Sequence, residues 1–152
     1  MTGAVLAIDV RGRAGQSLRE TWAGGPVNLM GLAVAGFPNL FTVTGPGSPS
    51  VLTNVIRAIE QHVDWLVRMF GDLRRDGVAV IEARAPAQAE WVAHVNEVAD
   101  RTLFTKTPSW YCGSDIPGKP KVFMPYAGGL PAYREAAERV ARNGYEGFAL
   151  TR

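Results

Sequence analysis

The chain has 152 residues, of which 47% are hydrophobic and 20% are charged, with a formal net charge of +2. That composition excludes a chain disordered throughout, and the scattered basic residues and short apolar runs exclude a nucleic-acid-binding or membrane-spanning protein. The single cysteine and the lack of a signal-peptide pattern indicate a cytoplasmic protein.

Strand and helix patterns alternate in the first half of the chain. Residues 6–10 alternate apolar and polar side chains, which predicts a strand. Ser17 and Glu20 form a capping-box pattern that predicts a short helix over 17–23. A buried strand over 40–44, a tight loop over 45–49 and a long helix over 50–70 follow.

The long helix is predicted from apolar residues at helical spacing. Pro49 suits its first turn. The residues expected on its buried face are Val51, Val55, Ile59, Val63, Leu66 and Phe70.

The second half predicts a strand over 78–83, helices over 86–103 and 131–142, and a final strand over 145–151. The helix over 86–103 should turn Val92, Val95, Val98 and Ala99 inward, and Asn143–Gly144 should end the next helix. The fold class is therefore α/β or α+β. Only about four strands joined by long loops are expected, which is typical of part of a larger fold.

The stretch TVTGPGSPSVLTN over 42–54 carries the first candidate site. A strand, a Gly/Pro loop and a helix start would present backbone N–H groups and the positive end of a helix dipole, which bind anions. The alternative is that these glycines and prolines only make the turn, because the pattern is neither GxGxxG nor a P-loop.

The stretch SWYCGSDIPGKPKVFMPYAGG over 109–129 carries the second candidate site. Trp110 and Tyr126 could line a ligand cleft, with Lys119 or Lys121 meeting a phosphate. The alternative is that Trp110, Phe123 and Tyr126 are core residues that hold a loop in place.

The remaining reactive side chains indicate no metal site and no catalytic group. His62 and His94 lie on separate predicted helices without a further ligand at metal spacing, and they are interpreted as helix-surface or hydrogen-bonded residues. Cys112 is interpreted as a small buried thiol.

The same segments resemble a known family over the whole chain. GFPNLFTVTGPGSPSVLTNVIRAIEQHVDW, EWVAHVNEVAD and SWYCGSDIPGKPKVFMPYAGGLPAYREAAERVARNGYEGFALT are similar to the C-terminal part of Baeyer–Villiger monooxygenases, flavoproteins of the cyclohexanone and phenylacetone monooxygenase type. The family's two GxGxxG fingerprints and its catalytic arginine lie upstream of this region, and no GxGxxG occurs here. The resemblance implies a partial C-terminal lobe of a two-dinucleotide-domain flavoprotein fold.

The resemblance also implies a domain assignment and site residues. Residues 1–152 would be a C-terminal fragment of the FAD-binding domain, including a control loop over about 109–121 that contacts NADP. The implied cofactor-binding residues are Thr44, Gly45, Pro46, Gly47, Ser48, Asn54, Trp110 and Lys119. The implied substrate-pocket residues are Ser50, Val51 and Leu52, and no catalytic residue is expected in the fragment.

The implied whole enzyme uses NADPH to reduce FAD, and uses O2 to insert one oxygen next to a ketone carbonyl. The chain alone is expected to be inactive, to retain no cofactor and to self-associate through exposed core surface. The alternatives are a free-standing, non-catalytic nucleotide-binding or interaction module, and a subunit completed by another chain.

Overall fold

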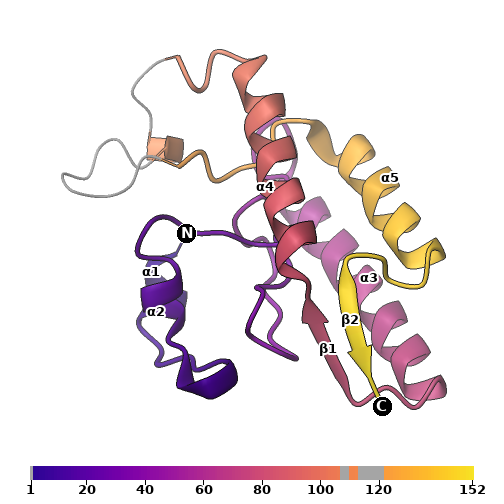
Figure 1. The fold of residues 1–152 in the computed structure, drawn as a ribbon. Coiled ribbons are helices and arrows are strands. Elements are labelled where there is room, and N and C mark those ends of the chain that lie inside the picture. The colour runs from indigo at the N-terminus through magenta and orange to yellow at the C-terminus, as the bar shows by residue number, and fades with distance from the viewer. Residues whose placement is uncertain (1, 107–109, 113–121) are drawn as a thin grey trace.

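A computed structural model describes residues 2–106, 110–112 and 122–152. Figure 1 shows that the segment with the first two helices lies to one side, while the longer helices and the two strands gather together. The elements are α1 (Gly3–Leu6), η1 (Arg13–Gly15), α2 (Leu18–Thr21), α3 (Val55–Arg75), β1 (Val80–Ala83), α4 (Ala85–Asp100), η2 (Trp110–Cys112), α5 (Gly129–Arg142) and β2 (Phe148–Thr151).

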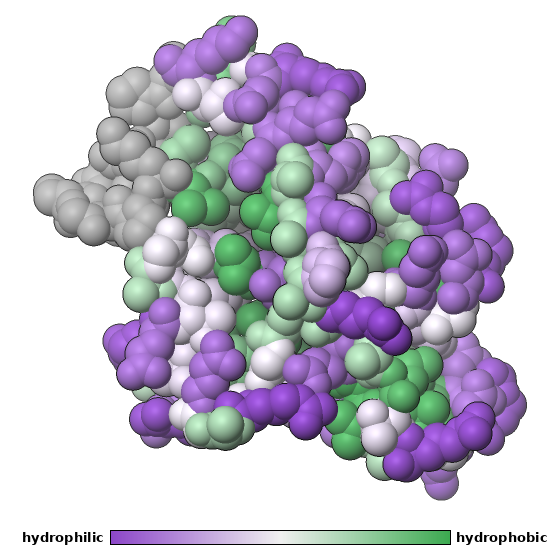
Figure 2. Space-filling view, in the orientation of Figure 1, coloured by the Kyte–Doolittle hydropathy of each residue, from purple (hydrophilic) through white to green (hydrophobic). Residues whose placement is uncertain are grey.

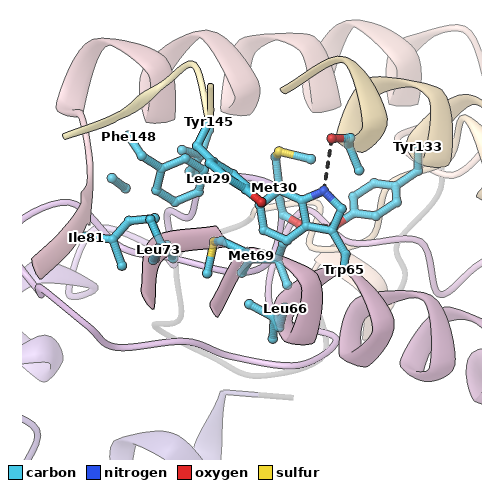
Figure 3. Close-up of a cluster of buried hydrophobic side chains, with 14 of the residues drawn as sticks. Leu29, Met30, Trp65, Leu66, Met69, Leu73, Ile81, Tyr133, Tyr145 and Phe148 are labelled. Atoms are coloured by element: carbon cyan, nitrogen blue, oxygen red, sulfur yellow. Dashed lines mark hydrogen bonds between the residues drawn. The ribbon is translucent and has the colours of Figure 1, made fainter. Parts of the chain in front are cut away.

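The main core lies where α3, α5 and the strands meet (Figure 3). Trp65 of α3 is 1% exposed, and its indole Nε1–H donates to the carbonyl oxygen of Ala137 at 3.0 Å. Tyr133 of α5 is fully buried, and its hydroxyl donates to the carbonyl oxygen of Met30 at 2.6 Å. Burying aromatic rings whose polar atoms are all paired stabilises this junction without a desolvation penalty.

The predicted elements of the second half are confirmed, with ends shifted by a few residues. β1 and β2 pair antiparallel, with Val80 opposite Thr151 and Ala83 opposite Phe148. Val95 and Ala99 of α4 are buried as predicted, and α5 ends at Arg142, with Asn143 as its C-cap and Gly144 at a φ of 67°. A positive φ is inexpensive only for glycine, which explains the helix end.

Two predicted strands in the first half are wrong. The 6–10 stretch follows the one-turn helix α1 and forms no strand, and 40–44 makes only an isolated bridge between Phe41 and Ala33. That bridge includes the hydrogen bond from the Thr42 N–H to the carbonyl oxygen of Leu32 at 2.8 Å. An alternating pattern specifies a strand only where a partner strand is available, and here irregular segments supply the hydrogen bonds instead. Among the described residues the sheet has two strands rather than about four.

The short helix at Ser17 is confirmed as α2, but its capping box does not form. The Ser17 side chain makes no capping hydrogen bond, whereas the hydroxyl of Thr21 donates to the Ser17 carbonyl oxygen at 2.9 Å. Leu18 and Trp22 pack with Val34 and Phe37 in a second, smaller core.

The long helix exists, but its start and its buried face differ from the prediction. α3 begins at Val55, because the Asn54 side chain caps the free N–H groups of Ile56 at 3.0 Å and Arg57 at 3.4 Å. The side of α3 that faces the core carries Ala58, Gln61, His62, Trp65, Leu66, Met69 and Leu73. Most of the residues predicted to be inward are exposed. The prediction searched for Val and Ile at helical spacing, whereas the residues that pack in this core are mainly Ala, His, Trp and Met.

No helix in the described part of the chain is long and apolar enough to cross a membrane. In the view of Figure 2, hydrophilic side chains cover most of α5.

Candidate functional site

The turn over 45–49 is built as a buried support. The Gly47 N–H donates to the carbonyl oxygen of Met124 at 2.6 Å, and the Ser48 N–H donates to that of Gly45 at 3.1 Å. Gly47 has a φ of 83°, and a Cβ there would lie 2.9 Å from the indole nitrogen of Trp91, which donates to the Gly47 carbonyl oxygen at 3.1 Å. Glycine is therefore required at this position, and the N–H groups of the turn form hydrogen bonds within the protein.

His62 fixes the entry to this turn from the core side. Its Nδ1 accepts the backbone N–H of Thr44 at 3.1 Å, and Thr44 has a φ of 55°. The ring is fully buried, its Nε2 has no hydrogen-bond partner in the described part, and it packs 5.2 Å from the ring of Tyr133. Burial lowers the pKa of His62 to about 4, so the imidazole is neutral and can accept this bond at neutral pH.

The next segment, residues 50–55, contains polar groups that have no hydrogen-bond partner among the described residues. Ser50 follows Pro49, which forms a parallel bridge with Tyr126, whereas no hydrogen bond joins the backbone N–H groups of residues 51–55 to any described residue. The hydroxyl oxygens of Ser50 and Thr53 are buried and also lack partners. Buried polar groups are nearly always paired, so the two buried hydroxyls beside a helix N-terminus mark a place where a ligand could supply partners. Leu52, Asn54 and Val55 are exposed at the same place.

Leu52 stands in the middle of that segment in a strained conformation. Its φ is 56°, which is unfavourable for a side chain with a Cβ, and 75% of the residue is exposed. Strain of this kind is held in place by surrounding structure and is concentrated at functional sites. A projecting apolar side chain beside free N–H groups can contact a flat ligand that has a polar edge.

The predicted residues from Thr44 to Asn54 are contiguous in the chain but differ in exposure. Ser48 is 1% exposed and Val51 is 4% exposed. The Val51 side chain packs in a third cluster with Ala99, Phe123 and Ala127, so it faces the interior. Leu52 is the residue of the predicted pocket set that projects outward.

The two aromatic residues in the described end of the second candidate segment belong to the core. Phe123 is 7% exposed and Tyr126 is 3% exposed, and the Tyr126 hydroxyl lies 3.3 Å from Nε2 of His94. Cys112 is half-buried, and burial raises the pKa of its thiol, as expected for an unreactive cysteine. The Trp110 backbone belongs to η2, whereas its side chain, Lys119, Lys121 and most of the predicted 109–121 loop lie outside the described residues.

Sequence reasoning did not find His62 or Trp91 as supports of this site. His62 was expected at the helix surface, yet it shares the buried side of α3 with Ala58 and Trp65. The one available signal was its helical spacing with those two residues, which a search for Val, Ile and Leu overlooks.

No model of a known protein family matches the chain. The chain is 44% identical over 151 residues to an acetone monooxygenase (methyl acetate-forming) of Gordonia sp., covering 99% of this chain and 28% of that protein. It is 38% identical over 143 residues to a Baeyer–Villiger monooxygenase of Pseudooceanicola batsensis, covering 94% of this chain and 26% of that protein. It thus spans little more than a quarter of the length of these relatives.

Solved structures agree with the sequence comparisons. The closed crystal structure of a cyclohexanone monooxygenase is 40% identical with a TM-score of 0.93, over 99% of this chain and 28% of that one. A structure of OTEMO in complex with FAD and NADP is 32% identical with a TM-score of 0.90, over 99% of this chain and 27% of that one. The chain therefore belongs to the Baeyer–Villiger monooxygenase family and corresponds to a C-terminal portion of its fold.

Proposed function

We propose that this chain forms the C-terminal part of the FAD-binding domain of a Baeyer–Villiger monooxygenase. In the proposed reaction, NADPH and O2 convert a ketone into an ester or lactone, with one oxygen atom entering the product and the other leaving as water. Bound FAD would supply the electron transfer that activates O2. This chain would contribute binding, orientation and a favourable electrostatic environment.

The observation that carries the proposal is the pair of buried, unpartnered hydroxyls of Ser50 and Thr53 beside the backbone N–H groups of residues 51–55 at the start of α3. Reduced flavin is negatively charged near N1 and the C2 carbonyl, and preorganised N–H donors at a helix N-terminus stabilise such charge. The free hydroxyls of Ser50 and Thr53 add two possible donors to the same edge. We assign this edge to the flavin ring.

The predicted cofactor residues take two roles in this proposal. Thr44, Asn54 and the 50–55 backbone would lie at the cofactor, whereas the Gly45–Ser48 turn would hold that segment in position through its buried hydrogen bonds. Leu52 would border the substrate pocket together with the backbone of Ser50 and Val51. The cofactor roles of Trp110 and Lys119 toward NADP rest on the sequence resemblance alone.

The test is a full-length chimera in which this chain replaces the matching part of the Gordonia acetone monooxygenase. We expect the chimera to bind FAD and to oxidise NADPH when a ketone is present. A folded chimera that binds FAD but turns over no ketone with NADPH would contradict the proposed function.

The flavin-facing edge is tested within that chimera by Leu52→Asp. A carboxylate introduced close to the flavin would repel the negative charge of its reduced form, by on the order of 2 kcal/mol at an effective dielectric of about 20. For a two-electron couple that is a shift of about 45 mV toward more negative flavin potential. Spectroelectrochemical titration measures the shift.

Leu103→Asp is the matched control, because Leu103 and Leu52 are both 75% exposed. An equal shift in both variants, or none in Leu52→Asp, would contradict the assignment of this edge while leaving the family activity intact.

A further inference from the structure

A groove of about 530 Å³ lies between α4 and α5 (Figure 1). Each helix lines it with residues spaced three or four apart, which share one helix face: Glu90 and His94 on α4, and Glu135 and Arg139 on α5. The volume is within the range of sites for small molecules, about 300–1,000 Å³. None of the lining residues belongs to the 44–54 stretch, so the groove is separate from the candidate cofactor site.

The buried part of the groove lining is aromatic and apolar. Leu29, Met30 and Tyr126 line it and are 5%, 1% and 3% exposed. The half-buried ring of Trp91 lies 5.4 Å from the ring of Tyr126. Because the Trp91 indole N–H donates to the Gly47 carbonyl oxygen at 3.1 Å, the ring is held in one position. A fixed indole beside an open groove is a preorganised surface for an apolar or cationic group.

The exposed part of the groove lining is acidic. Glu90, Glu135 and Glu146 are exposed carboxylates, and Arg139 is the lining residue that opposes their charge. Within the described part of the chain, Glu90, Glu135 and Arg139 form no ion pair or side-chain hydrogen bond. Glu146 accepts a hydrogen bond from the neutral amide of Asn143, which leaves its charge uncompensated. The groove is therefore negative, although the chain has a formal net charge of +2.

Unpaired carboxylates around an aromatic surface match the chemistry of an organic cation. Such a cation is attracted by the indole ring and by the carboxylates together, whereas the same carboxylates repel an anion. A metal ion is not favoured, because no group of three or more His, Cys, Asp or Glu side chains among the described residues could hold one. A metal ion would also leave the apolar lining uncovered.

The negative character ends at the groove. On the adjoining surface of α5, Glu135 lies beside Arg134 and Arg142. A basic protein partner would need about 800 Å² of complementary surface, and these two arginines would repel it. The limited extent of the negative surface therefore favours a small molecule.

We propose that the α4–α5 groove is a binding site for a small organic cation, with its ammonium group near Glu90 and Glu135 and its apolar part against Trp91. The proposal is independent of the proposed function, because it involves neither FAD nor the 50–55 segment.

The test titrates the whole 152-residue chain with choline and with dimethylbutanol, an uncharged analogue of choline in which a carbon atom replaces the nitrogen. Isothermal titration calorimetry measures the affinity, and the NMR signal of the Trp91 indole N–H reports where binding occurs. We expect choline to bind about tenfold more tightly than dimethylbutanol and to shift the Trp91 signal. Equal affinities, or a Trp91 signal that choline does not move, would overturn the proposal.

Substitutions locate the attraction within the groove. Glu90→Gln combined with Glu135→Gln keeps the side-chain size, and we expect it to weaken choline binding about tenfold without changing the thermal midpoint. Arg139→Gln should tighten choline binding, because it removes the opposing charge. Glu20→Gln combined with Asp100→Asn is the matched control, since it removes the same net charge at exposed positions outside the groove. Equal weakening by this control would reduce the effect to overall charge and overturn the site.

The folded chimera described above is the second setting, and we expect the same preference for choline there. Binding of choline to the isolated chain but not to the chimera would overturn the proposal, because the rest of the enzyme would then fill the groove. Binding of oligoarginine without binding of choline would also overturn it and would assign the groove to a basic protein partner. Ketone turnover by the chimera tests the proposed function separately.

Discussion

At the residue scale, His62 connects the core to the candidate site through a single hydrogen bond. The ring is buried and accepts the Thr44 N–H, and burial lowers its pKa to about 4 from an unfolded value of 6.5. Between those two values the unfolded chain takes up a proton that the folded chain does not. The contribution of His62 to the free energy of unfolding is therefore fully present above pH 6.5 and is lost as the pH falls toward 4.

This difference predicts a stability loss of about 3 kcal/mol between pH 6.5 and pH 4. Urea unfolding at a series of pH values measures it. His62→Asn should flatten the pH dependence in this window, because asparagine does not titrate. Asp72 and Glu138, whose pKa values are lowered, contribute mainly at lower pH. An unchanged slope in His62→Asn would show that another group causes the loss.

The hydrogen bond itself is tested by a pair of variants. His62→Asn places an amide oxygen near the position of Nδ1, whereas His62→Leu removes the acceptor. We expect faster amide hydrogen exchange at Thr44 in His62→Leu than in His62→Asn. Equal exchange rates in the two variants would mean that the turn holds its conformation without this bond.

At the scale of elements, the hydroxyl of Tyr133 makes one of the buried hydrogen bonds that attach α5 to the rest of the core. Tyr133 donates to the Met30 carbonyl oxygen at 2.6 Å, and burial raises the pKa of this phenol, so it stays protonated. Met30 itself is 1% exposed. No water can therefore replace the lost partner if the hydroxyl is removed.

We expect Tyr133→Phe to lower the free energy of unfolding by about 1–2 kcal/mol, because it leaves a buried carbonyl oxygen unpaired. Tyr145→Phe is the control. The Tyr145 hydroxyl donates at 2.5 Å to Asp72, whose side chain is 39% exposed and can be solvated by water. The control should lose less than about 1 kcal/mol. Chemical denaturation of both variants decides, and equal losses would contradict this account.

At the scale of the whole molecule, these 152 residues lack the sequence feature that would hold the pyrophosphate of the proposed cofactor. The sequence contains no GxGxxG, and that fingerprint supplies the pyrophosphate site of dinucleotide-binding domains. We therefore expect the purified chain to show no flavin absorbance band. A yellow protein with stoichiometric FAD would contradict the prediction.

The uncovered side of α3 predicts weak, concentration-dependent association of the isolated chain. Sedimentation velocity over a range of concentrations should show a monomer at low concentration and larger species at high concentration. Val63→Gln with Val67→Gln should shift the balance toward monomer. A monomer at every concentration would mean that the exposed apolar side chains of α3 do not drive self-association.

The sequence by itself determined the C-terminal half of the fold and the place of the candidate site. The helix over 86–103 was predicted from its apolar spacing, and the end of the helix over 131–142 was predicted from Asn143–Gly144, where a glycine is enough. The Gly/Pro stretch over 42–54 was also recognisable as a site. Each of these features depends on residues close together in the chain, so the pattern is enough.

Tertiary structure alone decided which side of α3 is buried and which atoms of the site remain free. Ala58, His62 and Trp65 face inward because Tyr133, Ala137 and the strands shape that space, and no local pattern contains those distant partners. The N–H groups of Gly47 and Ser48 form hydrogen bonds inside the protein, because the carbonyl groups of Met124 and Gly45 accept them, whereas no described acceptor lies at those of residues 51–55. Two strands were over-predicted for the same reason, since a strand needs a partner and these segments find hydrogen bonds elsewhere in the fold.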